Sequence, residues 1–188
     1  QEGSTADAMI HLEGKAGTAP DDRSVDFRFD VKRVPLSEWV PADWRTHVGG
    51  AVSSEIHWTG KDTKLENSAG QADCRIDSGD IHGLPFLNKL ADLANDRSFE
   101  RIKLDTCRFQ VKWQYPMVEM RQVVIEENGK FRAEGEVFSR KESLRGTIEL
   151  GVAPSLLKFL TAPVVEEVFP RSKDGYRWTT VHLSGTLE

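Results

Sequence analysis

The sequence lacks the features on which several common classes of protein depend. Its 188 residues contain no run of about 18 or more apolar residues, so nothing in it predicts a membrane-spanning helix. Basic residues are not in excess, since 25 Lys and Arg stand against 30 Asp and Glu, giving a net charge of -5. Phosphate contacts need a concentrated basic surface, and we therefore expect no nucleic-acid partner.

Cysteine and histidine are scarce and widely spaced. The 5 histidines are scattered and the 2 cysteines, Cys74 and Cys107, lie far apart, so no metal site and no cofactor is predicted. The two thiols could form one disulfide in an oxidising compartment or remain two core thiols. Alternation along the chain points Cys74 inward together with Ile76.

The bulk composition is that of a soluble globular protein, with 38% hydrophobic and 29% charged residues. A chain of this length suits a single β-rich domain over residues 1–188, with 1–66 and 67–188 as alternative sub-lobes. It begins at Gln1 and shows no basic and then apolar leader, so we expect a fragment of a longer protein.

Apolar residues recur at every second position along most of the chain. The clearest case is the segment 144–152, where Leu144, Ile148, Leu150 and Val152 fall on one side. Such alternation is typical of strands with one buried and one solvated face, and Asn128-Gly129 predicts a tight hairpin turn. The sequence therefore predicts an α+β fold, a mostly antiparallel, twisted β-sheet.

Three segments depart from this period and predict helices that cover the sheet. Residues 84–94 carry apolar residues at intervals of three and four, and residues 154–169 present a broad apolar surface with a kink at Pro163. These are the two amphipathic helices that we expect to pack on the sheet. Residues 35–44 predict a shorter helix, with Trp39 and Trp44 as packing anchors.

One short motif points to catalysis. Asp77-Ser78-Gly79 follows an apolar strand, as does the active-site loop of aspartic peptidases, in which two aspartates share a proton. Asp105-Thr106-Cys107 has cysteine where that loop needs glycine, so an enzyme of this type would be a homodimer contributing one Asp77 from each chain. The alternative interpretation is ordinary turn chemistry, and we favour no catalytic residue.

The order of several motifs resembles the carboxy-terminal region of AsmA-like proteins, which are large bacterial envelope proteins. A short helix in residues 35–44 leads into a strand of the form Gly-x-Val-x-x-x-Ile-x-Trp at residues 50–58, followed by a strand-to-helix junction at 79–87. Residues 150–152, 168–169 and 183–187 resemble the closing passage of the family. The resemblance covers most of residues 35–188.

This resemblance implies a non-catalytic domain on the periplasmic side of the bacterial envelope, which scaffolds or handles lipids in outer-membrane biogenesis. It also implies an inner-membrane anchor upstream of the residues present here, and it carries over no catalytic residue. The expected partners are lipid acyl chains or another envelope protein, which would meet Leu157, Leu160 and Val164 on the second helix. Two alternatives stay open: the homodimeric aspartic-type peptidase acting on extracellular proteins or glycoproteins, and an adhesive module that binds a partner through a sheet edge.

Overall fold

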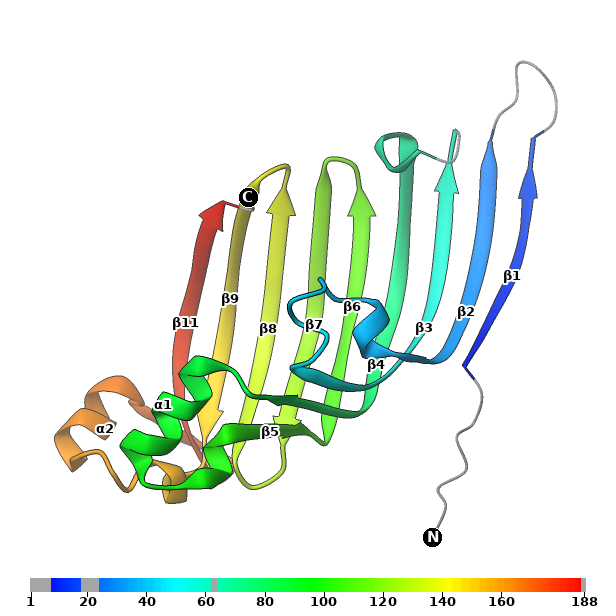
Figure 1. Ribbon diagram of the computed structural model, residues 1–188. Coiled ribbons are helices and arrows are strands. Elements are labelled where there is room, and N and C mark those ends of the chain that lie inside the picture. Colours follow the sequence, from blue (N-terminus) through cyan, green and yellow to red (C-terminus); the bar gives the residue numbers. More distant parts are fainter. Residues whose placement is uncertain (1–7, 18–23, 62–63, 187–188) are drawn as a thin grey trace, which may run out of the picture.

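A computed structural model describes residues 8–17, 24–61 and 64–186, and it is built around one large sheet (Figure 1). The sheet has 11 strands in the order β1-β2-β3-β4-β6-β7-β8-β9-β11-β10, with β5 paired to β4 beside this path. Every pair is antiparallel. The strands are β1 (Met9–Ala16), β2 (Val25–Pro35), β3 (Val48–Gly60), β4 (Ser68–His82), β5 (Arg101–Leu104), β6 (Thr106–Gln114), β7 (Met117–Glu127), β8 (Phe131–Arg140), β9 (Ser143–Val152), β10 (Arg171–Lys173) and β11 (Tyr176–Thr186).

Helices are few and short in the described residues. The two α-helices are α1 (Pro85–Ala94) and α2 (Ala162–Val168), and the 3₁₀ turns are η1 (Leu36–Glu38), η2 (Leu65–Asn67), η3 (Arg97–Glu100) and η4 (Pro154–Leu157). Neither helix has the length and apolar character needed to cross a bilayer. The prediction of a mostly antiparallel sheet with two helices is confirmed at this level.

The sheet runs without interruption across the boundary considered between residues 66 and 67. That boundary falls in the connection η2, and the strands on either side of it, β3 and β4, pair from Val48↔Ile81 to Gly60↔Ser68. Residues 183–186 of the passage that resembles the end of the family lie in β11, which ends at Thr186; Leu187 lies outside the described residues.

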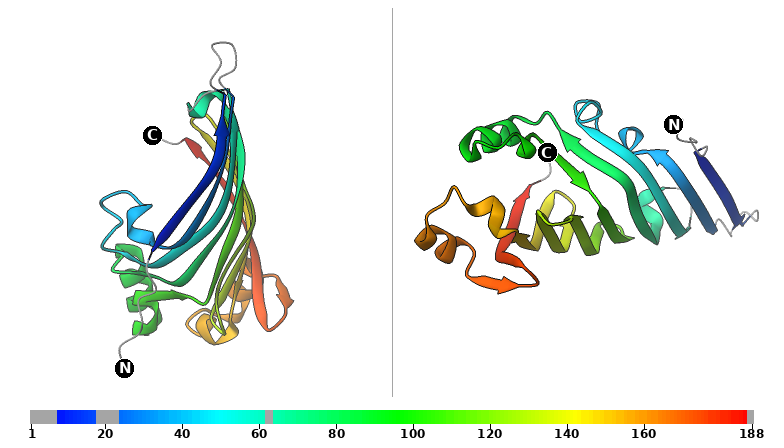
Figure 2. Two further views of the ribbon diagram at one scale, coloured as in Figure 1. Left: turned by 90° about the vertical axis from the view of Figure 1, so that its right-hand side faces the viewer. Right: turned by 90° about the horizontal axis from the view of Figure 1, so that it is seen from below.

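The sheet curves, and its two faces carry different elements (Figure 2). Helix α1 and the connection from β2 to β3 lie on the inner side of the curve, whereas α2 lies on the outer side. The end of the sheet that carries β1 has neither helix over it. The sheet is therefore a single layer over much of its width.

Bulges keep the apolar residues on one face along the long strands. The register shifts between Val31 and Val34 in β2 and between Met120 and Val123 in β7. Arg33 and Gln122 sit inside these shifts with φ of 52° and 51°, a left-handed conformation that accommodates the extra residue. Without the bulges, alternation would place Val34 on the face opposite to Val31 and Val123 on the face opposite to Met120. The extra residue in each bulge returns Val34 and Val123 to the apolar face.

The main buried cluster lies where α1 and β5 cover the inner side. Leu87 is 1% exposed and Ala91 is equally buried, both on the same side of α1. Leu104 of β5, Cys107 of β6 and Val123 of β7 are buried as well. A second cluster surrounds the C-terminal segment; it consists of Ala153, Leu157, Phe169 and Trp178.

The expected single helix over residues 154–169 is wrong. The segment forms η4, a non-helical stretch and the seven-residue α2, with Pro163 in the first turn of α2 rather than at a kink inside a longer helix. Proline cannot donate a backbone hydrogen bond and its ring clashes with the preceding turn, so a new helix begins there instead of the first one continuing.

Both cysteines are free thiols. Cys74 lies opposite Phe109 across the pair β4–β6, and its Sγ is 3.3 Å from Ser54 Oγ. Cys107 lies two residues before Phe109 in β6 and is buried. Burial raises the pKa of the Cys107 thiol from its ordinary 9.0 to about 11, and the neighbouring Cys74 adds to this.

Leu87→Ala should lower the free energy of unfolding by about 2–4 kcal/mol, because it leaves a cavity in the cluster under α1. Chemical denaturation followed by circular dichroism measures this. Lys89→Ala, at an exposed position on the same helix, is the control and should change stability by less than about 0.5 kcal/mol. Equal effects of the two substitutions would contradict the packing described for α1.

The Cys107 thiol should make stability fall at alkaline pH. The Cys107 thiol loses its proton near pH 9.0 in the unfolded chain but only near pH 11 in the folded chain. The stability that the protonated thiol contributes is therefore complete below pH 9.0 and is lost as the pH rises through about 11. Thermal unfolding between pH 8 and 11 measures the slope for the wild type and for Cys107→Ala. The variant should show a shallower decline across that window; parallel curves would refute the assignment.

Candidate functional site

A row of apolar residues crosses the inner face of the sheet at right angles to the strands. Cross-strand pairing links one residue from each of nine strands, eight of them with apolar side chains and one, on β9, a glycine. The row consists of Leu12, Phe29, Ile56, Ala72, Val111, Met120, Val137, Gly146 and Leu183. We call this series the apolar row. With strands about 4.8 Å apart, it is roughly 38 Å long.

The neighbouring row, one residue away along each strand, faces the opposite side and is almost entirely polar. It consists of Glu13, Arg28, His57, Gln71, Lys112, Glu119, Phe138, Arg145 and Ser184. The exception, Phe138, lies beneath the Arg121 guanidinium, 5.9 Å from the ring centre. The two faces of the sheet therefore differ sharply in chemistry.

The apolar row is not covered as a core would be. Only Ala72 in it is buried; Leu12 is 53% exposed and the other members are half-buried. The whole chain exposes 12921 Å², against ~9000 Å² expected for a compact protein of 21.1 kDa. Large exposed apolar patches mark sites where a protein, a lipid or another apolar ligand binds.

Aromatic residues line one border of this face, toward the end of the strands that carries the β3–β4 connection. Trp58 and Trp113 lie edge to face with their ring centres 5.7 Å apart, and Phe27 pairs with Trp58 across β2 and β3. Trp113 donates its indole N–H to Ser68 Oγ at 3.3 Å. Trp58 and Trp113 lie two residues along their strands from Ile56 and Val111, so they face the same side as the apolar row, and both are half-buried rather than enclosed.

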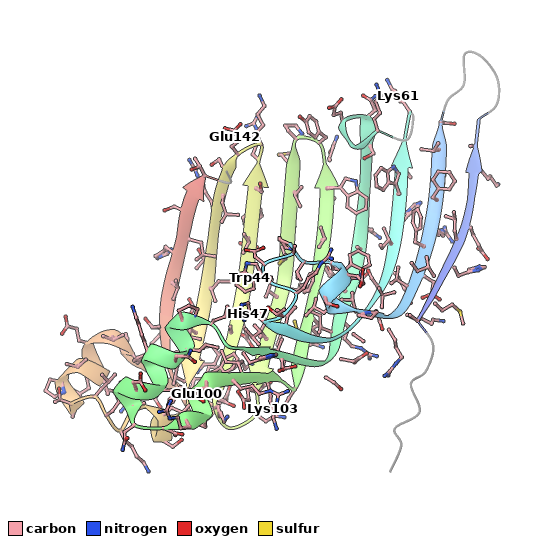
Figure 3. All side chains as sticks on the ribbon, in the orientation of Figure 1. Trp44, His47, Lys61, Glu100, Lys103 and Glu142 are labelled. Atoms are coloured by element: carbon pink, nitrogen blue, oxygen red, sulfur yellow. The ribbon has the colours of Figure 1, made fainter. Side chains whose placement is uncertain are left out.

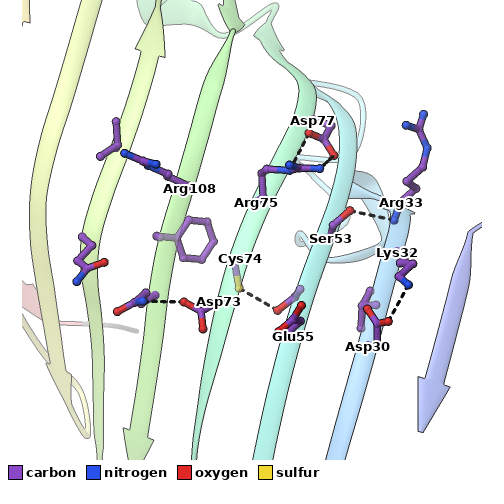
Figure 4. A pocket seen from close by; sticks show the side chains of 16 residues that line it. Asp30, Lys32, Arg33, Ser53, Glu55, Asp73, Cys74, Arg75, Asp77 and Arg108 are labelled. Carbon is purple, nitrogen blue, oxygen red and sulfur yellow. Dashed lines mark hydrogen bonds and ion pairs between the residues drawn. The ribbon is translucent and has the colours of Figure 1, made fainter.

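The opposite face carries an open depression of about 940 Å³ lined by charged side chains of β2, β3, β4 and β6 (Figure 4). Its charges largely neutralise one another: Lys32 lies 2.9 Å from Asp30, and Gln110 donates to Asp73 at 2.7 Å. The hydrogen bond that Lys32 donates to Asp30 raises the pKa of Lys32. Paired charges on a solvated face suit solubility better than recognition of one ligand.

Asp77, the candidate catalytic residue, lies in this depression beside Arg75. The Arg75 guanidinium contacts both carboxylate oxygens, at 3.0 Å and 3.2 Å. Ser78 follows with a φ of 50°, and Gly79 is buried against Ile76 and Leu104. This triplet is part of strand β4 at an irregularity in its pairing with β3. Both oxygens of the Asp77 carboxylate are therefore engaged by an arginine of the same strand.

The residues proposed to bind acyl chains or a partner on the C-terminal segment are divided by their exposure. Leu157 is buried, Leu160 is half-buried and Val164 is exposed. The segment lies on the outer side of the sheet, away from the apolar row (Figure 2). Of the three, Val164 alone presents its side chain freely to solvent.

A polar cluster holds the junction between β4 and α1. Asp80 accepts hydrogen bonds from His82 Nδ1 at 2.9 Å and from Arg101 Nε at 2.8 Å. His47 donates from Nδ1 to the His82 carbonyl at 3.1 Å, so the start of β3 is attached here as well. Within the described ranges, no three His, Cys, Asp or Glu side chains are arranged to hold a metal ion.

The expectation that Trp39 and Trp44 anchor a helix on the sheet is wrong. Trp39 is 50% exposed and Trp44 is 42% exposed, on a connection that forms only the turn η1 and further turns. Sequence reasoning treated them as core because tryptophan is highly buried on average. The signal that could have found them is the pair of prolines, Pro35 and Pro41, which keeps the segment from forming one continuous helix.

The chain was compared with known proteins by sequence and by structure. No family model matches it, and neither the curated proteins nor the solved structures contain a significant match. The geometry of the sheet therefore carries the functional argument.

Proposed function

We propose that this chain is a non-catalytic domain of a bacterial envelope protein, similar to AsmA-like proteins, which holds lipid acyl chains against the apolar row. The observation that carries the proposal is that row itself, continuous across nine strands and mostly half-buried. We place the domain on the periplasmic side of the envelope, where lipids pass toward the outer membrane.

The dimensions and energies suit acyl chains. The row is roughly 38 Å long, against about 15 Å for half of a bilayer's hydrocarbon core, so an extended chain fits along it. Each methylene that leaves water contributes about 0.8 kcal/mol, so ten of them give a gross gain of about 8 kcal/mol, from which the cost of losing translational, rotational and chain freedom is subtracted. The path would follow the twist that sheets of L-residues adopt.

A partner-binding module is the second candidate, because strand β1 leaves one edge of the sheet open. All eight of its residues are exposed, among them Ile10 and Leu12. An exposed edge of this length can accept a strand from another chain. The aspartic-type peptidase stays a hypothesis without a supporting contact, since Asp77 pairs with Arg75 of its own strand.

Purified protein should bind fatty acids or phospholipids as discrete adducts in native mass spectrometry. Val111→Asp should weaken this binding at least about tenfold, because it places a charge in the middle of the apolar row. Gln71→Asp is the matched control: it adds the same charge beside Ala72 of the row but on the opposite face, where His57 and Lys112 lie across the strand pairs. It should leave lipid binding unchanged.

Three outcomes separate the candidates. If the protein is folded and carries no lipid adduct after incubation with lipid, acyl-chain binding is refuted. Capture of a defined envelope protein that is unaffected by removing lipid favours the partner-binding module. Cleavage of a protein substrate that is lost in Asp77→Asn favours the peptidase.

A further inference from the structure

The connection from β2 to β3, residues 36–47, is the segment whose chemistry is least explained by the fold. We call it the strap. None of its residues is buried, although it contains two tryptophans, Trp39 and Trp44, with about half of each side chain exposed. A tryptophan offers 150–250 Å² of mostly apolar surface, so leaving two of them in water is unfavourable.

The strap lies on the inner side of the curved sheet. Figure 1 shows it projecting in front of the middle strands, and Figure 2 shows it standing away from the sheet on the side of α1. Figure 3 shows Trp44 in the part of the strap that overlies these strands. The apolar row lies on this same side of the sheet. Ile76 of β4 and Leu104 of β5 both approach the Cβ position of Gly79, so Ile76 faces the side that β5 covers. Ile76 alternates along β4 with Ala72 of the apolar row, so the row faces that side as well.

The strap has a defined shape. Trp44 N–H donates to the Pro41 carbonyl at 3.0 Å, and His47 N–H donates to the Trp44 carbonyl at 2.9 Å. The end of the strap is fastened to β4 by His82 N–H, which donates to the His47 carbonyl at 2.9 Å, and by the His47 ring. The hydrogen-bonded turns and the hydrogen bonds to β4 give the strap a defined conformation in front of the sheet.

We propose that the strap is the outer wall of the acyl-chain site, with Trp39 and Trp44 contacting the chain from the side opposite the apolar row. This inference rests on the proposed function and deepens it by naming a second binding surface. The chain would remove from water both the half-buried apolar row and the two exposed indole rings. The row alone offers an open trough, whereas the row and the strap together enclose a ligand on two sides.

Acyl chains carrying a bromine or nitroxide quencher test this contact. The 5 tryptophans allow variants that keep one each, with the other four replaced by phenylalanine. Bound quencher lipid should reduce the fluorescence of the Trp39-only and Trp44-only proteins by at least about half. The Trp58-only protein reports the apolar face, and the Trp178-only protein, buried under the C-terminal segment, is the control that should not change.

The outcomes distinguish the two levels of the proposal. Quenching of Trp58 but not of Trp39 or Trp44 overturns the role of the strap and leaves acyl-chain binding in place. Unchanged fluorescence in all of these proteins, together with the absence of lipid adducts, overturns the proposed function itself. As a second readout in the otherwise wild-type chain, Trp39→Ala/Trp44→Ala should raise the Kd for the same lipid about tenfold, whereas Arg45→Ala in the strap should leave it unchanged.

Discussion

The structure depends on the pairing of alternating strands in a register that places most of their apolar residues on one face. In an ordinary domain a second layer covers that face and supplies most of the stability. Here α1 and β5 cover only part of that face, so Leu87, Leu104 and Val123 are enclosed while Ile56 and Val111 are only half-buried. Hydrogen bonds between strands hold the sheet over the remaining width, and the same arrangement leaves an apolar surface available for binding.

Much of the sheet could be predicted from local pattern. Leu144, Ile148, Leu150 and Val152 alternate without exception and belong to one regular strand, β9. The turn at residues 128–129 also follows from residue type, since Gly129 has a φ of 73° and Lys130 N–H donates to the Glu127 carbonyl at 3.0 Å. Helix α1, Pro85–Ala94, was predicted by apolar residues at intervals of three and four.

Other features were beyond local pattern because they depend on neighbouring strands. Arg33, Ser78 and Gln122 adopt a left-handed backbone although none is glycine, and only their place in the sheet demands it. The C-terminal segment has the apolar content of a long helix, but Pro163 divides it. The candidate site shows the same division: the inward side of each strand was predictable, whereas the exposure of the apolar row and of Trp44 reflects the missing second layer.

The order of the strands has a consequence for how the molecule comes apart. Apart from the short β5 and β10, each strand pairs with strands that adjoin it in the chain, so cohesion passes from neighbour to neighbour as in a linear repeat array. Loss of β1 then removes one ladder and leaves β3 onward intact. Opening therefore proceeds by stepwise unzipping from the β1 margin toward the strands under α1, and amide exchange should be graded across the sheet rather than uniform.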